Sequence, residues 1–320
     1  MKINQHIEEA QKQEKTLFTF EILPPLKGQT IHDIYGNIDP LMEFKPPFIN
    51  VTYHREQVVY KRLTNGLLEQ KVVRKRPGTV GICAALMNRY EVDPVPHLLC
   101  GGFSKEDTEN ALIDLHFLGV ENVLALRGDG MQDQMYFVPE ADGHTYASEL
   151  VGQIVKMNNG EYLDDELANN ASTNFSIGVA GYPEKHFEAP SLNVDISNLK
   201  RKVEAGADYI VTQLFFDNSK YFEFVEKCRN AGINVPIIPG LKPIATKKHL
   251  SMLPHRFHVD LPDDLAMSVM QAKDNLAVRQ IGVEWAIQQA KELKAAGIPV
   301  IHFYSMGKSD NIYAIAKELF

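Results

Sequence analysis

Short runs of β-branched and aromatic residues recur along the chain, and segments with helical periodicity separate them. Apolar runs of about four to eight residues, bounded by turn-forming residues, are typical of buried strands. The pattern predicts eight strands, over Leu17–Leu23, Phe48–Tyr53, Val95–Cys100, Asn122–Arg127, Ile177–Tyr182, Tyr209–Phe216, Val235–Leu241 and Val300–Met306.

The segments between these runs predict helices that end at a glycine. The clearest cases are Ser104–Leu118, Leu192–Ala205, Lys220–Ala231 and Gln280–Ala296. A helix that ends in Gly and leads into a strand is half of a β/α unit, and repeated units form a parallel sheet. Eight strands therefore predict an α/β fold, a (β/α)8 TIM barrel with extra helices and long loops. A doubly wound sheet is the alternative, but the first strand runs into Pro24 and Pro25 instead of a glycine-rich turn.

Three intervals between the predicted strands are long, after the second, fourth and seventh strands. The fourth interval holds Gly128–Thr145 and a polar surface insertion, Met157–Asn174, while the seventh holds a loop at His255–Asp264 and at least one extra helix. We interpret the basic stretch Lys71–Arg76 as the solvated end of a helix. Without an internal repeat or a linker, residues 1–320 are expected to form a single barrel domain.

Composition narrows the class of protein. Hydrophobic residues make up 44% of the chain and charged residues 23%, as in globular proteins. The net charge of −8, with no basic stripe, argues against a nucleic-acid partner. No apolar run approaches the roughly 20 residues of a membrane helix. Residues 1–15 lack a secretory signal, and Cys83, Cys100 and Cys228 are scattered, so we expect a cytoplasmic protein with reduced thiols.

Several common kinds of site find no support in the sequence. His255 and His258 have H-x-x-H spacing, but they stand between Pro254 and Pro262 in the expected loop, and neither C-x-x-C nor H-E-x-x-H occurs. We therefore expect no metal site. A G-x-S-x-G elbow and a phosphate-binding P-loop are also missing from the sequence.

Polar side chains at the ends of the predicted strands are the candidates for chemistry, because barrel enzymes react at the C-terminal ends of their strands. Such groups need explaining, since an unpartnered polar group is unfavourable in an apolar setting. The set comprises Glu21, Thr52, His97, Arg127 with Asp129, Tyr182, Gln213 and Tyr304.

Three of these features have two interpretations each. Glu21 lies between Phe20 and Ile22, so it is either a carboxyl of raised pKa suited to acid catalysis or the partner of a basic residue on another strand. The turn Arg127–Asp129 is either a ligand-binding edge or a salt-bridged turn. The helical segment Asp195–Lys202 ends in cations that either hold a phosphate or face solvent.

Eleven short runs, in order and at matching spacing from about residue 17 to residue 306, give the chain a resemblance to a known family. They are Phe20-Glu21 with Pro24-Pro25, Phe48–Tyr53, Pro96–Leu98, Ala125–Asp129, Tyr146–Val151, Val179–Pro183 with His186 and Glu188-Ala189, Asn198–Val203, Ala205–Ala207, Thr212–Asp217, Ile238–Gly240 with Pro243, and His302–Tyr304. Taken together these runs resemble the methylenetetrahydrofolate reductases, flavoenzymes of one-carbon metabolism that supply methyl groups for methionine biosynthesis.

The resemblance implies a (β/α)8 barrel that binds FAD without a Rossmann motif at the C-terminal ends of its strands. It also implies that NADH or NADPH and 5,10-methylenetetrahydrofolate use one flavin face in turn, a ping-pong scheme, and that the protein is a homo-oligomer. Glu21 is then the expected general acid. Asp129 is the second expected catalytic residue, near the flavin pyrimidine and the folate, where its carboxylate tunes the flavin potential and hydride delivery. Gln213 is expected as a ligand of the pterin.

The same resemblance assigns the cofactor contacts. It implies flavin contacts at Thr52, His97, Arg127, Gly128, Asp129, Tyr146, Ala147, Tyr182, His186 and Ala189. It implies contacts to the ribityl, phosphate or adenosine portions at Asp195, Asn198, Arg201 and Lys202. Many family members have Thr-Leu-Asn-Arg after the last strand, where this chain has Ser305-Met306-Gly307-Lys308, so Lys308 takes the place of an arginine expected at the folate.

Two other functions remain open from the sequence. One is a flavin- or folate-binding barrel subunit without independent reductase activity, and the other is a folate-binding methyltransferase barrel that uses no flavin.

Overall fold

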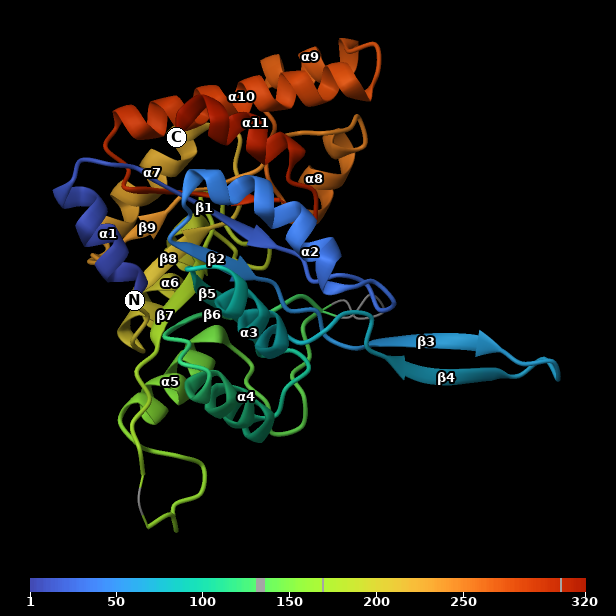
Figure 1. Cartoon of the computed structure of the whole chain (residues 1–320), viewed down its shortest axis with the longest axis vertical. Helices are drawn as coiled ribbons and strands as arrows, with labels where there is room; N and C mark the ends of the chain where they lie inside the picture. Colours follow the sequence, from blue (N-terminus) through green and yellow to red (C-terminus); the bar gives the residue numbers. More distant parts are fainter. Residues whose placement is uncertain (131–135, 169, 306) are drawn as a thin grey trace.

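The computed structural model describes residues 1–130, 136–168, 170–305 and 307–320. One parallel sheet runs through most of the chain (Figure 1). Its strands are β1 (Leu17–Ile22), β2 (Phe48–Val51), β5 (Asp93–Leu99), β6 (Asn122–Leu126), β7 (Ser176–Gly181), β8 (Tyr209–Thr212), β9 (Ile237–Ile238), β10 (Gly240–Leu241) and β11 (Val300–Tyr304).

The sheet closes on itself at Pro239. The strand order is β10-β11-β1-β2-β5-β6-β7-β8-β9, and β9 and β10 are two halves of one strand on either side of this proline. Strand β9 pairs with β8, where Ile237 is opposite Ile210. Strand β10 pairs with β11, where Gly240 is opposite His302. Although Pro239 lacks an N–H, its carbonyl accepts the His302 N–H at 3.0 Å. The eight strand positions therefore form the expected (β/α)8 barrel.

Helices follow the strands and cover the outside of the barrel (Figure 1). They are α1 (Ile3–Lys12), α2 (Ile31–Ile38), the 3-10 helix η1 (Asp39–Phe44), α3 (Thr79–Arg89), α4 (Lys105–Phe117), α5 (Ala147–Asn158), α6 (Leu192–Glu204), α7 (Asn218–Asn230), α8 (His249–Phe257), α9 (Asp263–Gln271), α10 (Asn275–Ala295) and α11 (Asp310–Leu319). Side-chain caps begin several of them: Ser104, Ser191, Asp217 and Asp274 each accept a backbone N–H.

The hydrophobic pattern predicts all eight strand positions, although Met306 lies outside the described residues. Two local predictions are wrong. Lys71–Arg76 is no helix end, because Leu68–Val73 form strand β4 and residues 74–76 are irregular. His255–Asp264 is only partly a loop, because α8 continues through Pro254 to Phe257 and α9 begins at Asp263.

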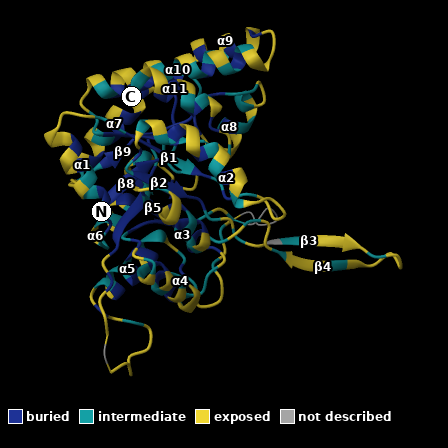
Figure 2. Ribbon diagram, viewed as in Figure 1, coloured by how far each residue is buried: buried dark blue, intermediate teal, exposed yellow. Residues whose placement is uncertain are grey.

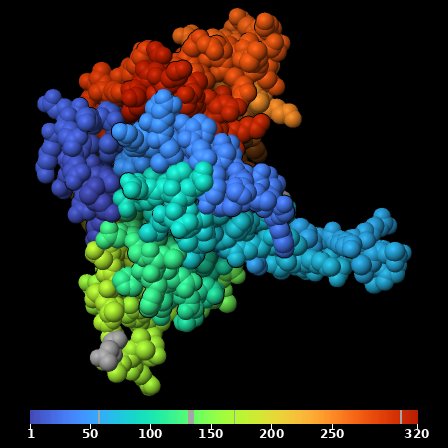
Figure 3. All heavy atoms as spheres, viewed as in Figure 1, coloured from blue at the N-terminus to red at the C-terminus, as the bar shows by residue number. Residues whose placement is uncertain are grey.

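A two-stranded antiparallel arm, β3 (Gln57–Arg62) and β4 (Leu68–Val73), extends from the barrel after β2 (Figures 1 and 3). Its turn is built around Asn65-Gly66, with Gly66 at φ +85° and the Leu63 N–H donating to the Leu67 carbonyl at 2.8 Å. Asn-Gly between β-branched runs is a strong hairpin signal. Local turn chemistry therefore prevails over the helical interpretation of Lys71–Arg76.

Apolar side chains fill the barrel at the N-terminal ends of the strands. Phe48, Val95, Tyr209 and Val300 are buried there together with Ile3 and Ile7 of α1, which closes this end. A larger apolar layer lies between the strands and the outer helices, where the ribbon is mostly buried (Figure 2). The interior at the opposite, C-terminal ends is left for polar side chains.

The three cysteines, Cys83, Cys100 and Cys228, are free thiols and all are buried. Burial raises the pKa of each thiol, that of Cys228 to about 11. Within the described part of the chain, no helix is both long and apolar enough to cross a membrane.

Helix α10 approaches the loop after β10 at Gly282, where a Cβ would overlap the Ile244 carbonyl. We expect Gly282→Ala to lower the free energy of unfolding by about 1–3 kcal/mol, because the clash is with backbone that has little room to move. Gly152 in α5 is the matched control, since a Cβ there meets no atom of the described residues within 4 Å outside its own helix backbone. Gly152→Ala should be neutral or stabilising by up to about 1 kcal/mol. Urea unfolding of both variants measures the difference, and equal stabilities would contradict the packing argument.

Candidate active site

The C-terminal ends of the strands carry a polar interior. Along β1, Thr19 and Glu21 are two residues apart and so face the same side of the sheet. In the ladder, Glu21 pairs with Tyr304 of β11 on one side and with Asn50 of β2 on the other. Parallel pairing thus brings residues almost 300 positions apart to one rim.

At and below this rim lies a buried layer of four polar side chains, Thr19, Asn50, His97 and His302. The Thr19 hydroxyl lies 3.1 Å from His302 Nδ1, and the Asn50 amide lies 3.4 Å from His97 Nε2. Burial lowers the pKa of each imidazole to about 3, so both rings are neutral at physiological pH. His302 Nε2 is buried and has no hydrogen-bond partner among the described residues. The layer therefore offers a bound molecule a hydrogen-bonding position without a charge.

Glu21 borders this layer, and its side chain is only partly accessible. Burial raises the pKa of its carboxyl to about 7, and the charge of Lys242 opposes that rise. Among the described residues no hydrogen bond to its side-chain oxygens is formed, while its backbone carbonyl accepts from Ser305 Oγ at 2.7 Å. Glu21 is therefore a carboxyl that can hold and release a proton near neutral pH, which is what acid catalysis requires.

Lys242 is the main residue that the sequence analysis does not identify. Leu241 pairs with Phe303, so Lys242 follows at the level of Tyr304, which itself pairs with Glu21. Lys242 is 6% exposed, and its ammonium makes no hydrogen bond or ion pair within the described residues. Burial lowers its pKa to about 8, although the Glu21 carboxylate favours the charged form. The sequence does hold a signal for Lys242, because it is a charged residue directly after an apolar strand. The predicted strand ends at Leu241, so Lys242 is not counted among the strand-end residues.

Two further groups lie close to this pair. His249 of α8 accepts the Ala245 N–H at Nδ1 over 3.1 Å, and burial together with the Lys242 charge lowers its pKa to about 4. The Tyr304 hydroxyl donates a hydrogen bond to the Thr212 carbonyl, and burial raises the pKa of this hydroxyl well above its usual value. Both groups are therefore neutral, which leaves Glu21 and Lys242 as the groups that titrate near neutral pH here.

A second cluster follows β6 and β7, on the other side of the barrel mouth. Arg127 forms a two-pronged ion pair with Glu188, at 2.6 and 2.8 Å, and its guanidinium lies 5.1 Å from the centre of the Phe137 ring. The Arg127 hydrogen bonds hold the pKa of Glu188 below its usual value. Both interpretations of the Arg127 turn stay open, because a salt-bridged arginine is also fixed in place to contact a ligand.

Helix α6 brings a buried cation into the same cluster. The Lys202 ammonium donates to the Ala180 carbonyl, and burial lowers its pKa to about 8 while Asp195 favours the charged form. The Asp195 carboxylate accepts the backbone N–H of His186 at 2.9 Å, and the His186 ring lies edge-on to Tyr182 with 4.8 Å between centres. Arg127, Tyr182, His186, Asp195 and Lys202, five residues expected to contact a cofactor, thus form one connected group.

The other expected site residues differ from one another in burial and contacts. Thr52 is buried with its hydroxyl on the Ile22 carbonyl, Ala189 is buried, and Gly128 takes φ +84° beside Leu99. The Gln213 side-chain oxygen accepts the Leu214 N–H at 2.9 Å. The remaining positions are Asp129, Tyr146, Arg201 and Lys308, which are exposed, and Ala147 and Asn198, which are half-buried.

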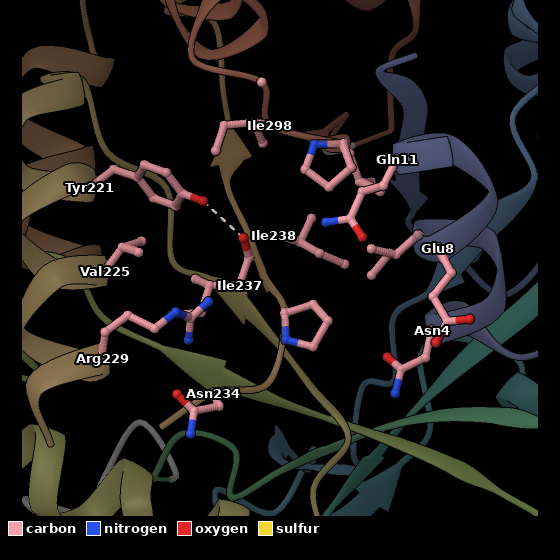
Figure 4. A pocket seen from close by; sticks show the side chains of 15 residues that line it. Asn4, Glu8, Gln11, Tyr221, Val225, Arg229, Asn234, Ile237, Ile238 and Ile298 are labelled. Carbon is pink, nitrogen blue, oxygen red and sulfur yellow. Dashed lines mark hydrogen bonds between the residues drawn. The ribbon is translucent and has the colours of Figure 1, made fainter. Parts of the chain in front are cut away.

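One pocket lies away from both clusters. It has a volume of about 490 Å³ and sits at the N-terminal end of the barrel, between α1, α7 and the starts of β9 and β11 (Figure 4). Tyr221 and Arg229 line it, but both donate to backbone carbonyls of the same region. We assign it no reaction, because barrel chemistry takes place at the other end of the strands.

No group of three His, Cys, Asp or Glu side chains in the described part of the chain is arranged to hold a metal ion. His255, one of the two histidines with metal-like spacing, lies within α8, and His258 directly follows the helix.

Residues 2–320 match the family model of methylenetetrahydrofolate reductase. The chain is 31% identical over 320 residues to the 5,10-methylenetetrahydrofolate reductase of Escherichia coli, covering 99% of this chain and 94% of that protein. It is 32% identical to methylenetetrahydrofolate reductase 1 of Schizosaccharomyces pombe, covering all of this chain and 48% of that protein. The chain thus spans about half the length of the yeast relative and of the plant relatives, such as that of Arabidopsis thaliana.

Among solved structures, a Clostridium thermocellum protein described as binding two copies of 5-methyl-5,6,7,8-tetrahydrofolic acid superposes with a TM-score of 0.59. The match covers 99% of this chain and 98% of that one at 14% identity, so it shows a shared fold.

The Glu21–Lys242 arrangement leads to a prediction about proton affinity. Replacing Lys242 by Leu removes the positive charge that stabilises the carboxylate, so the pKa of Glu21 should rise above about 7. Lys242→Arg keeps the charge and should leave the pKa nearly unchanged, and Lys248→Leu, at the exposed N-cap position of α8, is the matched control. Carbon-13 NMR titration of the Glu21 carboxyl measures the shift. An equal pKa in Lys242→Leu and the unmodified protein would show that the two groups do not interact.

Proposed function

Since this chain belongs to the methylenetetrahydrofolate reductase family, we propose that it reduces 5,10-methylenetetrahydrofolate to 5-methyltetrahydrofolate with NADH or NADPH, through bound FAD in a ping-pong scheme. We propose residues 1–320 as the catalytic unit. The observation that carries the proposal is the placement of Glu21 at the barrel rim, where burial raises the pKa of its carboxyl to about 7. A reductase of this substrate needs such a proton donor.

The need for an acid follows from the substrate. In 5,10-methylenetetrahydrofolate one carbon bridges two nitrogens, and such a carbon is a poor hydride acceptor. Protonation of the leaving nitrogen opens the ring and gives a 5-iminium cation, which accepts hydride readily. A carboxyl with an ordinary pKa would be ionised at pH 7 and could not donate this proton efficiently. Burial of Glu21 keeps a large fraction of it protonated.

Lys242 has a different part in this scheme. It does not need to contact the folate, because its charge acts on Glu21 and keeps the pKa of the carboxyl from rising further. Once Glu21 has given up its proton, the ammonium stabilises the carboxylate that remains. Gln213 is proposed as a ligand of the pterin, because a side-chain amide both donates and accepts hydrogen bonds. Asp129 and Lys308 are proposed to contact the folate at the exposed edge of the site.

The cluster around Arg127 suits a large anionic cofactor. Lys202 and Arg127 are fixed cations, and Arg201 lies on the same helix as Lys202. Cations of this kind bind a pyrophosphate. Gly128, with φ +84° and no side chain, leaves its backbone open to close approach by a flat ring, and His302 Nε2 is a buried ring nitrogen without a hydrogen-bond partner among the described residues. These residues fit FAD, with the ring portion proposed near Thr52, His97, Gly128, Tyr146, Ala147, Tyr182, His186 and Ala189, and the remainder near Asp195, Asn198, Arg201 and Lys202.

When bound, FAD would supply the hydride that this substrate accepts. The reductant is proposed to be a nicotinamide nucleotide, in line with the Arabidopsis thaliana relative, whose name includes NADH. The fold shared with a protein described as binding 5-methyl-5,6,7,8-tetrahydrofolic acid gives further support to a folate substrate.

The acid role of Glu21 predicts a selective loss. Glu21→Gln should reduce folate at least about a hundredfold more slowly, because general acid catalysis typically contributes about 10²–10⁴ in rate. The same variant should keep its NADH–menadione activity, which needs no proton from Glu21. In the unmodified protein the folate half-reaction should slow as the pH rises through about 7, where the carboxyl ionises.

Stopped-flow absorbance of the flavin measures both half-reactions, and Glu226→Gln on α7, at an exposed position, is the control. Normal folate reduction by Glu21→Gln would rule out the acid assignment. If the unmodified protein is yellow, and so binds flavin, but forms no methyltetrahydrofolate, the result would instead support the alternative of a barrel subunit without independent reductase activity.

The cation cluster predicts a loss of cofactor affinity. Lys202→Met removes a buried ammonium, and because a charge-assisted hydrogen bond contributes about 1.5–3 kcal/mol, FAD should dissociate at least about tenfold more readily. Lys200→Met on the exposed side of the same helix should leave FAD affinity unchanged. Fluorescence titration of the apoprotein with FAD measures both. Equal affinities of the two variants would remove Lys202 from the cofactor site.

A further inference from the structure

The arm formed by residues 57–73 is the most unusual feature of the surface. Strands β3 and β4 pair only with each other within the described residues, so each has an outer edge without a neighbouring strand. The arm stands clear of the barrel in the space-filling view and is mostly exposed or half-buried along its length (Figures 2 and 3). It accounts for much of the long interval after the second barrel strand, which no part of the proposed reaction uses.

The two faces of the arm differ in chemistry. Cross-strand pairing places Val58 opposite Val72, Tyr60 opposite Gln70 and Arg62 opposite Leu68 on one face. Three large apolar side chains of this face are exposed, Tyr60 at 62%, Leu68 at 65% and Val72 at 63%. On the other face Val59 pairs with Lys71 and Lys61 with Glu69, so that face carries three charged side chains. The arm is therefore amphipathic, with its apolar face turned to solvent.

An exposed ribbon of this kind is unfavourable in a lone chain. A two-stranded hairpin by itself is marginally stable in water, and unpaired edges with apolar side chains are prone to bind another surface. The base of the arm is nevertheless held firmly. Arg76 donates to the Pro24 carbonyl, and Arg74 lies over the Tyr53 ring, 5.9 Å from its centre. The arm is thus fixed in a direction in which its own barrel leaves the apolar face uncovered.

The charge of the arm indicates which surface covers its apolar face. Residues 57–76, the arm and its base, contain six Lys and Arg and one Glu, a formal charge of +5. The whole chain carries −8, so the rest of it carries −13. The remainder of a second chain with this same sequence therefore complements the arm in charge. Complementary charge of this kind favours and steers association.

We propose that the β3–β4 arm is an interaction element that packs its apolar face, Tyr60, Leu68 and Val72, against a second copy of this chain. In a closed two-fold arrangement each protomer contributes one arm and receives one, so both apolar faces are covered at once. The basic base of the arm then faces the acidic body of the partner. This inference concerns assembly and stands whether or not the proposed reaction is correct.

The main test compares the mass of the full chain in solution with that of a variant whose arm is shortened. Gln57 and Val73 face each other across the ribbon, so an Asn-Gly turn can replace residues 58–72 without disturbing the barrel. We expect the unmodified chain to be a dimer or a higher oligomer by sedimentation velocity. The shortened variant should dissociate with a Kd at least about tenfold higher. A monomeric unmodified chain, or an unchanged Kd, would overturn the proposal.

Point variants separate the apolar contribution from the charge. Tyr60→Ser with Val72→Ser should weaken association, whereas Phe117→Ser on α4, where the side chain is 85% exposed, should not. Lys61→Glu with Lys71→Glu should also weaken it, and high salt should weaken the unmodified oligomer because screening reduces the attraction between the arm and the acidic body. Equal effects of the arm and Phe117 variants would contradict a specific surface.

A photo-cross-linking amino acid at position 60 tests the identity of the partner directly. With purified protein alone, irradiation should give a product with the mass of two chains, and the same amino acid at position 117 should not. A purified protein that gives only the single-chain mass would overturn the proposal and leave the arm for a different protein. Circular dichroism melting of every variant verifies that the barrel is intact.

Discussion

Closure of the parallel ladder across Pro239 is the constraint on which the rest of the molecule depends. The seventh strand is short and interrupted, yet its two halves bond to both neighbours and turn an open sheet into a barrel. Closure fixes the register of every strand, and register decides which side chains share a level. Glu21, Tyr304 and Lys242 lie at one level because β1, β11 and β10 are aligned in parallel, with nothing in the local sequence of any of them to indicate it.

The barrel wall also sets the electrostatics of its mouth. An apolar plug made by α1 and the lower strand residues closes one end, so water reaches the interior from the other. Histidines in the buried layer lose their protons, while Glu21 and Lys242 are drawn toward the same narrow range of pH, near 7 and 8. On the opposite wall of the mouth, a positive charge is maintained by an ion pair. There Arg127 is fixed by Glu188, so a cation persists where burial alone would disfavour it. One side of the mouth is thus arranged to exchange protons and the other to hold a permanent charge.

Sequence patterns were sufficient for the barrel and for many residues of its mouth. Strands are short apolar runs with a strong local signal, and Glu21 stood out because it interrupts such a run. Lys242 did not, because it follows a strand whose end the pattern placed at Leu241, and its importance comes from a register that only the closed sheet defines. The arm was missed for a different reason. Its Asn-Gly turn is a clear local signal, but the basic residues after it also suit a helix end, and neighbouring apolar positions are too few to distinguish the two. The pairing of Arg127 with Glu188 depends on a loop conformation that residue spacing does not specify.

The burial of all three cysteines has a practical consequence. A thiol introduced at an exposed position would be the only one readily accessible to a maleimide or a nitroxide reagent, because Cys83, Cys100 and Cys228 are enclosed and resist ionisation. Asn65, at the tip of the arm, is such a position. The natural sequence can therefore carry a single fluorophore or spin label without prior removal of cysteines, which makes the position of the arm relative to the barrel directly measurable.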